Sequence, residues 1–270
     1  MGDHVLILRQ VAETGIEISP IGLGTVKLGR DKGVKYPTGF TIPDDREAGK
    51  LIALAKNLGI NLIDTAPAYG RSEERLGVLL QGQRHDWIIC SKVGEEFDNE
   101  TGESSFNFTP EHVRFSVERS LKRLNTDYID MLLVHSDGND VDIIKRYGIL
   151  ELLEELKKQG KIRATGMSTK TVAGGLLALE KSDCAMVTYN LEHRDEQAVL
   201  DYAAENNKAI LLKKALASGH ICKDADVDPV QASFEFIFAH PGVTSAIVGT
   251  INPAHLTSNI KLAEATIAQL

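Results

Sequence analysis

Cysteine, aromatic residues and excess basic charge are all sparse in this 270-residue chain. Its three cysteines, Cys90, Cys184 and Cys222, show no CxxC spacing, which argues against a disulfide framework and against a cysteine zinc site. We expect reduced, structural thiols, and we predict a cytoplasmic location. The formal net charge of −8 argues against nucleic acid as a constitutive partner, because phosphate binding requires concentrated Lys and Arg side chains.

Long apolar runs are also missing. No run reaches the roughly 18 apolar residues that a membrane-spanning helix requires. The first ten residues contain the acidic Asp3 and only a short apolar run at 5–8, so they predict neither a signal peptide nor a span. We therefore expect no membrane partner. The hydrophobic share of 43%, with 6% aromatic residues, is typical of a globular α/β protein with an aliphatic core.

Short apolar runs of strand length alternate with amphipathic stretches of helical period from about residue 45 to the C-terminus. The expected strands are 18–23, 60–64, 87–91, 128–134, 162–167, 185–188, 209–212 and 245–248. The expected helices are 45–58, 72–80, 109–124, 149–159, 171–179, 195–206, 229–238 and 253–267. The pattern is therefore a repeated strand-then-helix unit.

This repetition predicts the fold class α/β, as a (β/α)8 TIM barrel. Strands that each feed a helix and return in parallel need crossover connections, and eight such units close most economically into a barrel. An open, doubly wound sheet is the alternative. It normally carries GxGxxG after its first strand, and the run from Gly22 to Lys27 does not complete that motif. No repeat, charge block or linker divides the chain, so we expect a single domain over residues 1–270.

Two connections break the rhythm of the chain. The segments 27–43 and 94–108 are polar, glycine-rich and longer than the usual strand-to-helix loop. Because active sites of α/β barrels are built from loops after the strand ends, we interpret both as candidate substrate walls, with mobile surface insertions as the alternative. Asp137, Asn139 and Asp140 are expected to form a solvated loop after the fourth strand.

Four polar residues stand just after consecutive expected strands. Asp64 and Tyr69 follow the second strand, Lys92 the third and His135 the fourth. A barrel brings the ends of these strands to one mouth. A single charged residue at the end of a buried strand is more often a satisfied structural group. Four of complementary type on successive strands favour a functional interpretation.

These four side chains form a chemically coherent set. A phenol is a useful proton donor only if its proton becomes easier to lose, and Lys92 beside Tyr69 would have that effect. Asp64 would hold Lys92 charged, and His135 would orient a carbonyl oxygen or relay its proton. The alternative is a metal hydrolase using 135–137 and 193–195, but no second HxH or HxxE spacing supports it. We therefore predict a site without metal.

The motif DTAxxYG ending in Tyr69 and Gly70, the SKVG run around Lys92 and the LxH segment at His135 together resemble the aldo-keto reductases. The resemblance extends from 14–25, which looks like a hairpin and first strand closing the barrel bottom, to 241–250. It implies an N-terminal β-hairpin, Tyr69 as general acid/base tuned by Lys92 and Asp64, and His135 as the group that positions the substrate oxygen. It also implies hydride transfer to or from nicotinamide C4 without a covalent enzyme intermediate.

The same resemblance implies a set of cofactor-binding residues. Gly24, Thr25 and Asp64 would border the nicotinamide, and Ser168 with Thr169 stands where the family holds the carboxamide with Ser-Asn. Residues further along would contact the rest of the nucleotide: Lys213, Lys214 and Leu216 at the pyrophosphate, and Gly249, Thr250, His255 and Asn259 at the adenosine end. The alternative for the two lysines is a solvated loop.

Two positions depart from the family pattern, because a glutamine is replaced by Met186 and a stacking aromatic residue by Lys213. Gly249 and His255 also replace the Lys and Arg that favour a 2′-phosphate, and His255 cannot match a guanidinium at pH 7. We expect NADP(H) by family tendency, with NAD(H) or dual use as alternatives.

The predicted function is hydride transfer between NAD(P)(H) and a small aldehyde, ketone or sugar-like alcohol. The alternative is a nicotinamide-binding redox sensor or regulatory subunit with little turnover. The chain ends soon after its last helical pattern, so we expect the short C-terminus of bacterial-type members. Specificity would then rest on the two long loops. The sequence leaves the substrate and the oligomeric state open.

Overall fold

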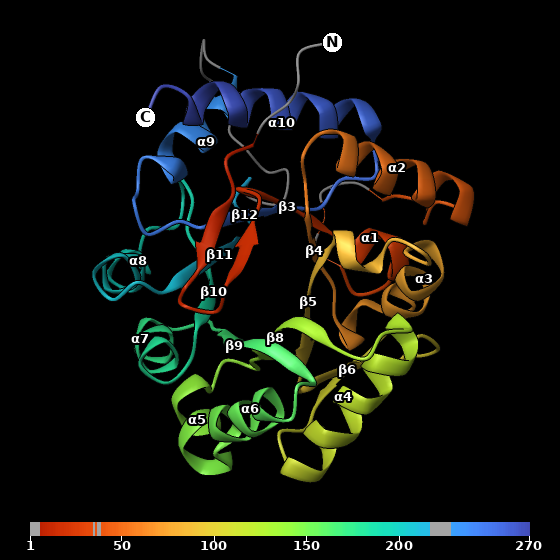
Figure 1. The fold of residues 1–270 in the computed structure, drawn as a ribbon, viewed down its shortest axis with the longest axis vertical. Helices are drawn as coiled ribbons and strands as arrows, with labels where there is room; N and C mark the ends of the chain where they lie inside the picture. The colour runs from red at the N-terminus through yellow and green to blue at the C-terminus, as the bar shows by residue number, and fades with distance from the viewer. Residues whose placement is uncertain (1–5, 35, 37–38, 217–227) are drawn as a thin grey trace.

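Eight parallel strands close into a barrel surrounded by helices in the computed structural model, which describes residues 6–34, 36, 39–216 and 228–270 (Figure 1). Around the barrel the order is β3, β4, β5, β8, β9, β10, β11 and β12, with β12 paired back to β3. Their bounds are β3 Ile21–Gly24, β4 Leu62–Asp64, β5 Ile88–Val93, β8 Ile129–His135, β9 Ile162–Ser168, β10 Cys184–Thr188, β11 Ala209–Lys213 and β12 Ser245–Val248. The predicted (β/α)8 TIM barrel is confirmed.

A hairpin precedes the barrel. It pairs β1 (Arg9–Val11) with β2 (Ile16–Ile18) in antiparallel register. Its apolar side chains are buried with the lower interior residues of the barrel, Leu62 and Cys90 among them, so the hairpin plugs the end away from the site. The expected strand 18–23 is wrong in its boundary: β2 ends at Ile18, and β3 begins only after Ser19 and Pro20.

Helices form the outer layer around the barrel (Figure 1). The eight predicted from periodicity occur as α2 Asp45–Asn57, α3 Ser72–Leu79, α4 Pro110–Leu124, α6 Ile149–Lys158, α7 Val172–Lys181, α8 Gln197–Glu205, α9 Pro229–Phe238 and α10 Pro253–Ile267. Local signals fix their starts: in α2, Asp44 and Glu47 form a capping box. No helix among the described residues is long and apolar enough to cross a membrane.

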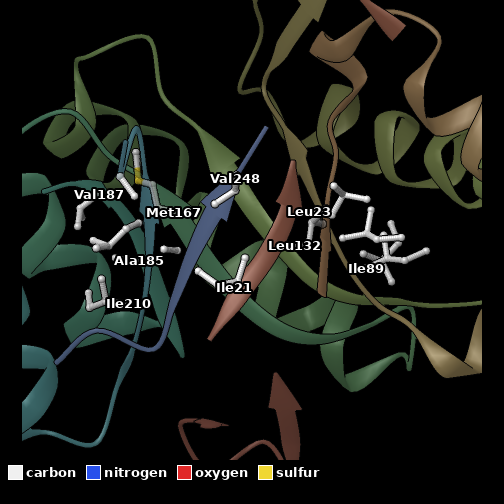
Figure 2. Close-up of a cluster of buried hydrophobic side chains, with 14 of the residues drawn as sticks. Ile21, Leu23, Ile89, Leu132, Met167, Ala185, Val187, Ile210 and Val248 are labelled. Atoms are coloured by element: carbon white, nitrogen blue, oxygen red, sulfur yellow. The ribbon is translucent and has the colours of Figure 1, made fainter. Parts of the chain in front are cut away.

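Strand alternation sorts the side chains into two layers. On β4, Ile63 packs outward against the helices, whereas Leu62 belongs to the interior cluster. On β11, Ile210 and Leu212 face outward while Ala209 and Leu211 face inward. Figure 2 shows side chains of the outward cluster on neighbouring strands, with labels on Ile21, Leu23, Ile89, Leu132, Met167, Ala185, Val187, Ile210 and Val248. Because the period is two, the next inward position along each strand lies at the mouth.

Three elements stand where the sequence predicts loops. The connection 94–108 contains a second hairpin, β6 (Glu95–Phe97) with β7 (Ser104–Phe106). A short helix, α1 (Val26–Gly29), follows β3, and α5 (Asp140–Tyr147) follows β8. The solvated loop expected around Asp140 is therefore wrong in part. Asp140 is buried and accepts hydrogen bonds from the Thr171 hydroxyl and the Lys170 amide. These bonds link the segment after β8 to the segment after β9.

Candidate active site

The four residues predicted at the mouth come from four different elements. Asp64 ends β4, Lys92 lies in β5 two residues after the inward-facing Cys90, and His135 ends β8. Tyr69 ends a 3-10 turn, Pro67–Tyr69, whose first residue suits the fixed φ of proline. Gly70 ends this turn at φ 60, and a Cβ there would lie 2.2 Å from the carbonyl oxygen of Gly29. This contact requires glycine after the tyrosine.

Lys92 is the hub of a compact polar cluster. Its Nζ lies 2.5 Å from Asp64 Oδ1 and 3.0 Å from the Tyr69 hydroxyl, and it also donates to the carbonyl of Thr65 at 2.9 Å. The Tyr69 hydroxyl lies 3.2 Å from Asp64 Oδ2. Lys92 and Asp64 are buried, whereas Tyr69 keeps part of its surface at the mouth. The structure therefore brings three of the four predicted residues into direct contact.

The charges of this cluster are set by opposing effects. Burial raises the pKa of Tyr69 above its usual value and Asp64 raises it further, while Lys92 lowers it. For Lys92, burial lowers the pKa, but the adjacent Asp64 outweighs burial and the net pKa is raised. Lys92 thus acts on Tyr69 in the expected direction, but desolvation outweighs it. At neutral pH Tyr69 is a protonated phenol beside an ammonium.

His135 has a partner that the sequence analysis did not single out. Its Nδ1 lies 2.9 Å from Glu95 Oε2, at the start of the hairpin β6 and β7. Burial lowers the pKa of His135, and Glu95 opposes that shift. Burial alone would raise the pKa of Glu95, but the His135 interactions, Ser104 and Arg30 lower it to about 2. Its position in the sequence is the only signal that could have identified Glu95, because it stands three residues after Lys92, where the chain leaves the barrel at the end of β5.

A cavity of about 690 Å³ opens above these side chains. Every strand of the barrel contributes a lining residue, and segment 27–43 adds Lys27, Arg30, Gly33, Val34 and Tyr36. The predicted residues that line it are Gly24, Asp64, Tyr69, Lys92, His135, Ser168, Lys213, Lys214, Leu216, Gly249, Thr250, His255 and Asn259. Segment 94–108 lines it through Glu95. The volume falls in the range of small-molecule sites, roughly 300–1,000 Å³.

Two predicted cofactor contacts lie behind the cavity wall. Thr25 is fully buried, and its hydroxyl donates to the carbonyl of Asp64 at 2.7 Å and accepts from Ser72. It braces the catalytic strand rather than lining the cavity. Thr169 is also buried, and its hydroxyl has no hydrogen-bond partner within the described part of the chain. A buried hydroxyl without a partner is costly, and a ligand supplies that partner only if this part of the wall shifts toward the cavity.

The two lysines after β11 separate. Lys213 turns inward, where its Nζ donates to Ser168 Oγ at 3.0 Å and to the carbonyl of Thr169 at 2.6 Å. Lys214 is exposed at the cavity rim, with a left-handed backbone at φ 56. Burial lowers the pKa of Lys213 to about 8, although Glu196 acts in the opposite direction. The sequence treats the two lysines as one phosphate-binding pair, whereas the structure gives them different surroundings.

The far end of the cavity reaches the start of α10. Asn252 caps this helix by accepting from the amides of Ala254 and His255 at 2.9 and 3.3 Å. A Cβ on Gly249 would lie 3.6 Å from the hydroxyl of Tyr36, so the Tyr36 side chain lies close to the end of β12. An anion at this end meets the positive end of the helix dipole, and Lys214 lines the same cavity.

These features fit a nicotinamide nucleotide. The inner part offers a proton-transfer cluster and the Ser168 hydroxyl, with the unpartnered Thr169 hydroxyl behind it, and these suit the polar edge of a carboxamide. The outer part offers a cation and a helix N-terminus, which suit phosphate. Among the described residues no group of three His, Cys, Asp or Glu side chains could hold a metal ion.

Comparison with known proteins agrees with this chemistry. The model of the "Aldo/keto reductase family" matches residues 20–221. The chain belongs to the aldo/keto reductase family. A solved Pseudomonas aeruginosa chain assigned to the aldo-keto reductases is 60% identical with a TM-score of 0.88, covering 98% of this chain and 96% of that one. The Bacillus subtilis aldo-keto reductase YhdN is 37% identical over 77% of this chain and 62% of its own length.

A third relative extends over nearly the whole chain. The Bacillus subtilis oxidoreductase YqkF is 26% identical across 95% of this chain and 91% of its own length. Family membership makes this aldo/keto reductase an oxidoreductase that uses a nicotinamide nucleotide and acts on carbonyl or alcohol substrates.

Proposed function

We propose that this chain is a single-domain reductase of small aldehydes, ketones or sugar-like carbonyls, with Tyr69 as its general acid and base. The observation that carries the proposal is the position of Lys92 Nζ, 2.5 Å from Asp64 and 3.0 Å from the Tyr69 hydroxyl, under an open cavity. A neutral phenol held against an ammonium is a proton donor whose conjugate base is stabilised as it forms.

In the reducing direction the chain's own residues handle the proton. A bound reduced nicotinamide supplies the hydride that the carbonyl carbon receives. Tyr69 delivers its proton to the substrate oxygen, and Lys92 stabilises the negative charge that develops on the phenol oxygen. Asp64 keeps Lys92 charged and in place. His135, held by Glu95, positions the substrate oxygen beside the Tyr69 hydroxyl. In alcohol oxidation Tyr69 accepts the proton instead.

NADPH is the preferred nucleotide in this proposal. Lys214 and the start of α10 together place a cation and a helix N-terminus at the outer end of the cavity, and both favour additional phosphate. Relatives differ in cofactor: the fission-yeast relative yakc is named with NADP(+), whereas an Escherichia coli relative is named an NADH-specific methylglyoxal reductase. Preference therefore follows from local residues, not from family membership.

The test is equilibrium titration of the purified protein with NADPH and, separately, with NADH, followed by nucleotide fluorescence. We expect tight NADPH binding, weaker NADH binding and NADPH consumption with members of a carbonyl panel. Equal binding of the two nucleotides would replace the NADP(H) preference by dual use. Binding of neither would overturn the cofactor assignment and, with it, the roles of Asp64, Tyr69, Lys92 and His135.

A second candidate function, a nicotinamide-binding redox sensor, is favoured by Met186 and Lys213 at cavity positions where the family pattern has other residues. The variant Tyr69→Phe separates the two candidates. A reductase loses turnover by about 10²- to 10⁴-fold while nucleotide affinity stays unchanged, because only the proton donor is removed. A sensor shows no turnover in the wild type with any carbonyl, and the variant then changes nothing.

A further inference from the structure

Lys213 is an ammonium group placed inside the mouth of the barrel. On β11 it is the next inward-facing position after Ala209 and Leu211, and it lines the cavity. Its two hydrogen-bond partners, Ser168 Oγ and the carbonyl of Thr169, are neutral oxygens. No carboxylate of the described residues lies within ion-pair distance of its Nζ. Its positive charge therefore has no contact with a carboxylate, and the carboxylates that act on it, Glu196 first, do so without a direct ion pair.

The other charges around the inner cavity are paired. Lys92 is matched by Asp64 at 2.5 Å, and Glu95 by Arg30 at 3.8 Å. These pairs leave little net charge on the β4, β5 and β8 side of the mouth. Lys213, in contrast, lines the cavity without a carboxylate in contact among the described residues.

Lys213 also stands close to the reacting centre. Its side chain reaches across β10 to Ser168, and in the parallel register Ser168 is the direct neighbour of His135 on β8. The charge of Lys213 contributes to the lowered pKa of His135. The substrate oxygen is expected beside Tyr69 and His135, and the nicotinamide ring must lie next to the carbon that carries this oxygen. The ring would therefore lie close enough to Lys213 to feel its charge.

We propose that Lys213 makes this site discriminate between the redox states of the nucleotide, favouring the neutral reduced nicotinamide over the cationic oxidised ring. This inference rests on the proposed function and deepens it. An oxidised nicotinamide carries a positive charge and a reduced one does not, so repulsion from Lys213 acts on one redox state only. The chain is thereby biased toward carbonyl reduction, because product nucleotide is held less tightly than the nucleotide that enters.

The bias depends on pH. Burial lowers the pKa of Lys213 to about 8, so the ammonium loses its charge near the upper end of the neutral range. The charged groups that act on Lys213 are Glu196, Lys214, Asp140 and Lys170, and His135 faces it across the cavity. As pH rises through 8 the repulsion disappears, and the affinity for the oxidised nucleotide rises toward that for the reduced one.

The experiment measures affinities rather than turnover. NADPH is titrated by fluorescence and NADP⁺ by displacement of NADPH, in the wild type and in Lys213→Met and Lys213→Arg. We expect the ratio of the NADP⁺ to the NADPH dissociation constant to fall about tenfold in Lys213→Met and to be retained in Lys213→Arg, because one unit charge at roughly 10 Å in a protein site has this effect. The matched control Lys214→Met should weaken both nucleotides equally.

A second measurement needs no variant. In the wild type the same ratio should fall between about pH 7 and pH 9.5, where an amine of lowered pKa deprotonates. A ratio that is unchanged in Lys213→Met and constant with pH, while both nucleotides bind, would overturn this inference and leave the proposed function standing. Failure of the wild type to bind either nucleotide would overturn both.

Discussion

The two sides of the barrel mouth are built differently. On the side of β4, β5 and β8, charged groups contact one another: Lys92 meets Asp64 and Tyr69, and His135 meets Glu95. On the side of β9 to β12, the hydroxyl of Thr169 lacks a partner among the described residues, and Lys213 has only neutral partners. On the first side the charged groups have their closest contacts with one another. The second side is suited to completion by a ligand.

Because of this difference, we expect substitutions on the two sides to change different quantities, stability on one side and ligand affinity on the other. A buried charge whose partner is removed costs stability as well as activity, because the remaining charge stays desolvated. Substitution of a polar group that has no partner in the free protein changes its stability little, but it lowers affinity for a ligand that would bond to that group. Substitutions on the first side should therefore lower stability, and substitutions on the second side should lower nucleotide affinity.

The largest effect is expected from Lys92→Met. It leaves Asp64 charged and buried without its partner, so the free energy of unfolding should fall by about 3–5 kcal/mol in denaturant titrations. The double variant Lys92→Met with Asp64→Asn should regain much of this stability but no turnover, since the proton-transfer group stays incomplete. A single variant as stable as the wild type would contradict the picture of a side completed by internal charge pairs.

An intermediate effect is expected from Glu95→Gln, with a clear dependence on pH. The folded protein lowers the pKa of Glu95 from 4.5 to about 2, so ionised Glu95 stabilises the fold above pH 4.5, and this contribution is lost as pH falls through 2. The variant should be less stable than the wild type by at most about 3 kcal/mol near pH 6, and the difference should shrink on acidification.

Urea unfolding of Glu95→Gln at several pH values between about 2.5 and 6 measures this prediction. The matched control is Glu103→Gln, an exposed residue of the same connection, which should show no such pH dependence. Turnover should fall in Glu95→Gln because His135 loses the group that raises its pKa and holds its ring. A stability difference that does not change with pH would disprove the stabilising role of the ionised Glu95 carboxylate beside His135.

The smallest effect is expected on the other side of the mouth, from Thr169→Val. The change replaces a buried hydroxyl that has no partner by a methyl group of similar size, so the free protein should keep its stability or gain a few tenths of a kcal/mol. Nucleotide affinity should nevertheless fall about 3- to 10-fold, the worth of one hydrogen bond. Unchanged affinity measured by fluorescence titration would show that the nucleotide does not contact Thr169.

Much of the first side could be predicted from sequence, for a local reason. Strand alternation places Asp64 two residues beyond the inward Leu62 and Lys92 two beyond Cys90. Parallel closure then brings these positions to one mouth, so a motif read along the chain becomes a contact in space. Glu95 could not be predicted in this way, because its position depends on the hairpin of β6 and β7. The polar segment 94–108 shows no hydrophobic alternation that would predict this hairpin.

The other side was less predictable. The inward parity of Lys213 can be read from Ala209 and Leu211, but its partner Ser168 lies 45 residues earlier in the chain. The resemblance placed Lys213 and Lys214 together at phosphate, whereas alternation and the left-handed turn at Lys214 direct them apart. Thr25 was expected at the cofactor, but its hydroxyl is used by Asp64 and Ser72. Cys222, which we expect to be a reduced structural thiol, lies outside the described residues.

The sequence by itself determined the barrel, its helices and the identity of the polar set at the strand ends, because hydrophobic period and strand parity are local properties of the chain. Only the tertiary structure decided which polar groups are satisfied and which are not. Burial raises the pKa of Tyr69 and outweighs the lowering effect of Lys92, and the hydrogen-bond partners of Lys213 are neutral oxygens. Both depend on desolvation and on contacts between distant strands, which exist only after the barrel has closed.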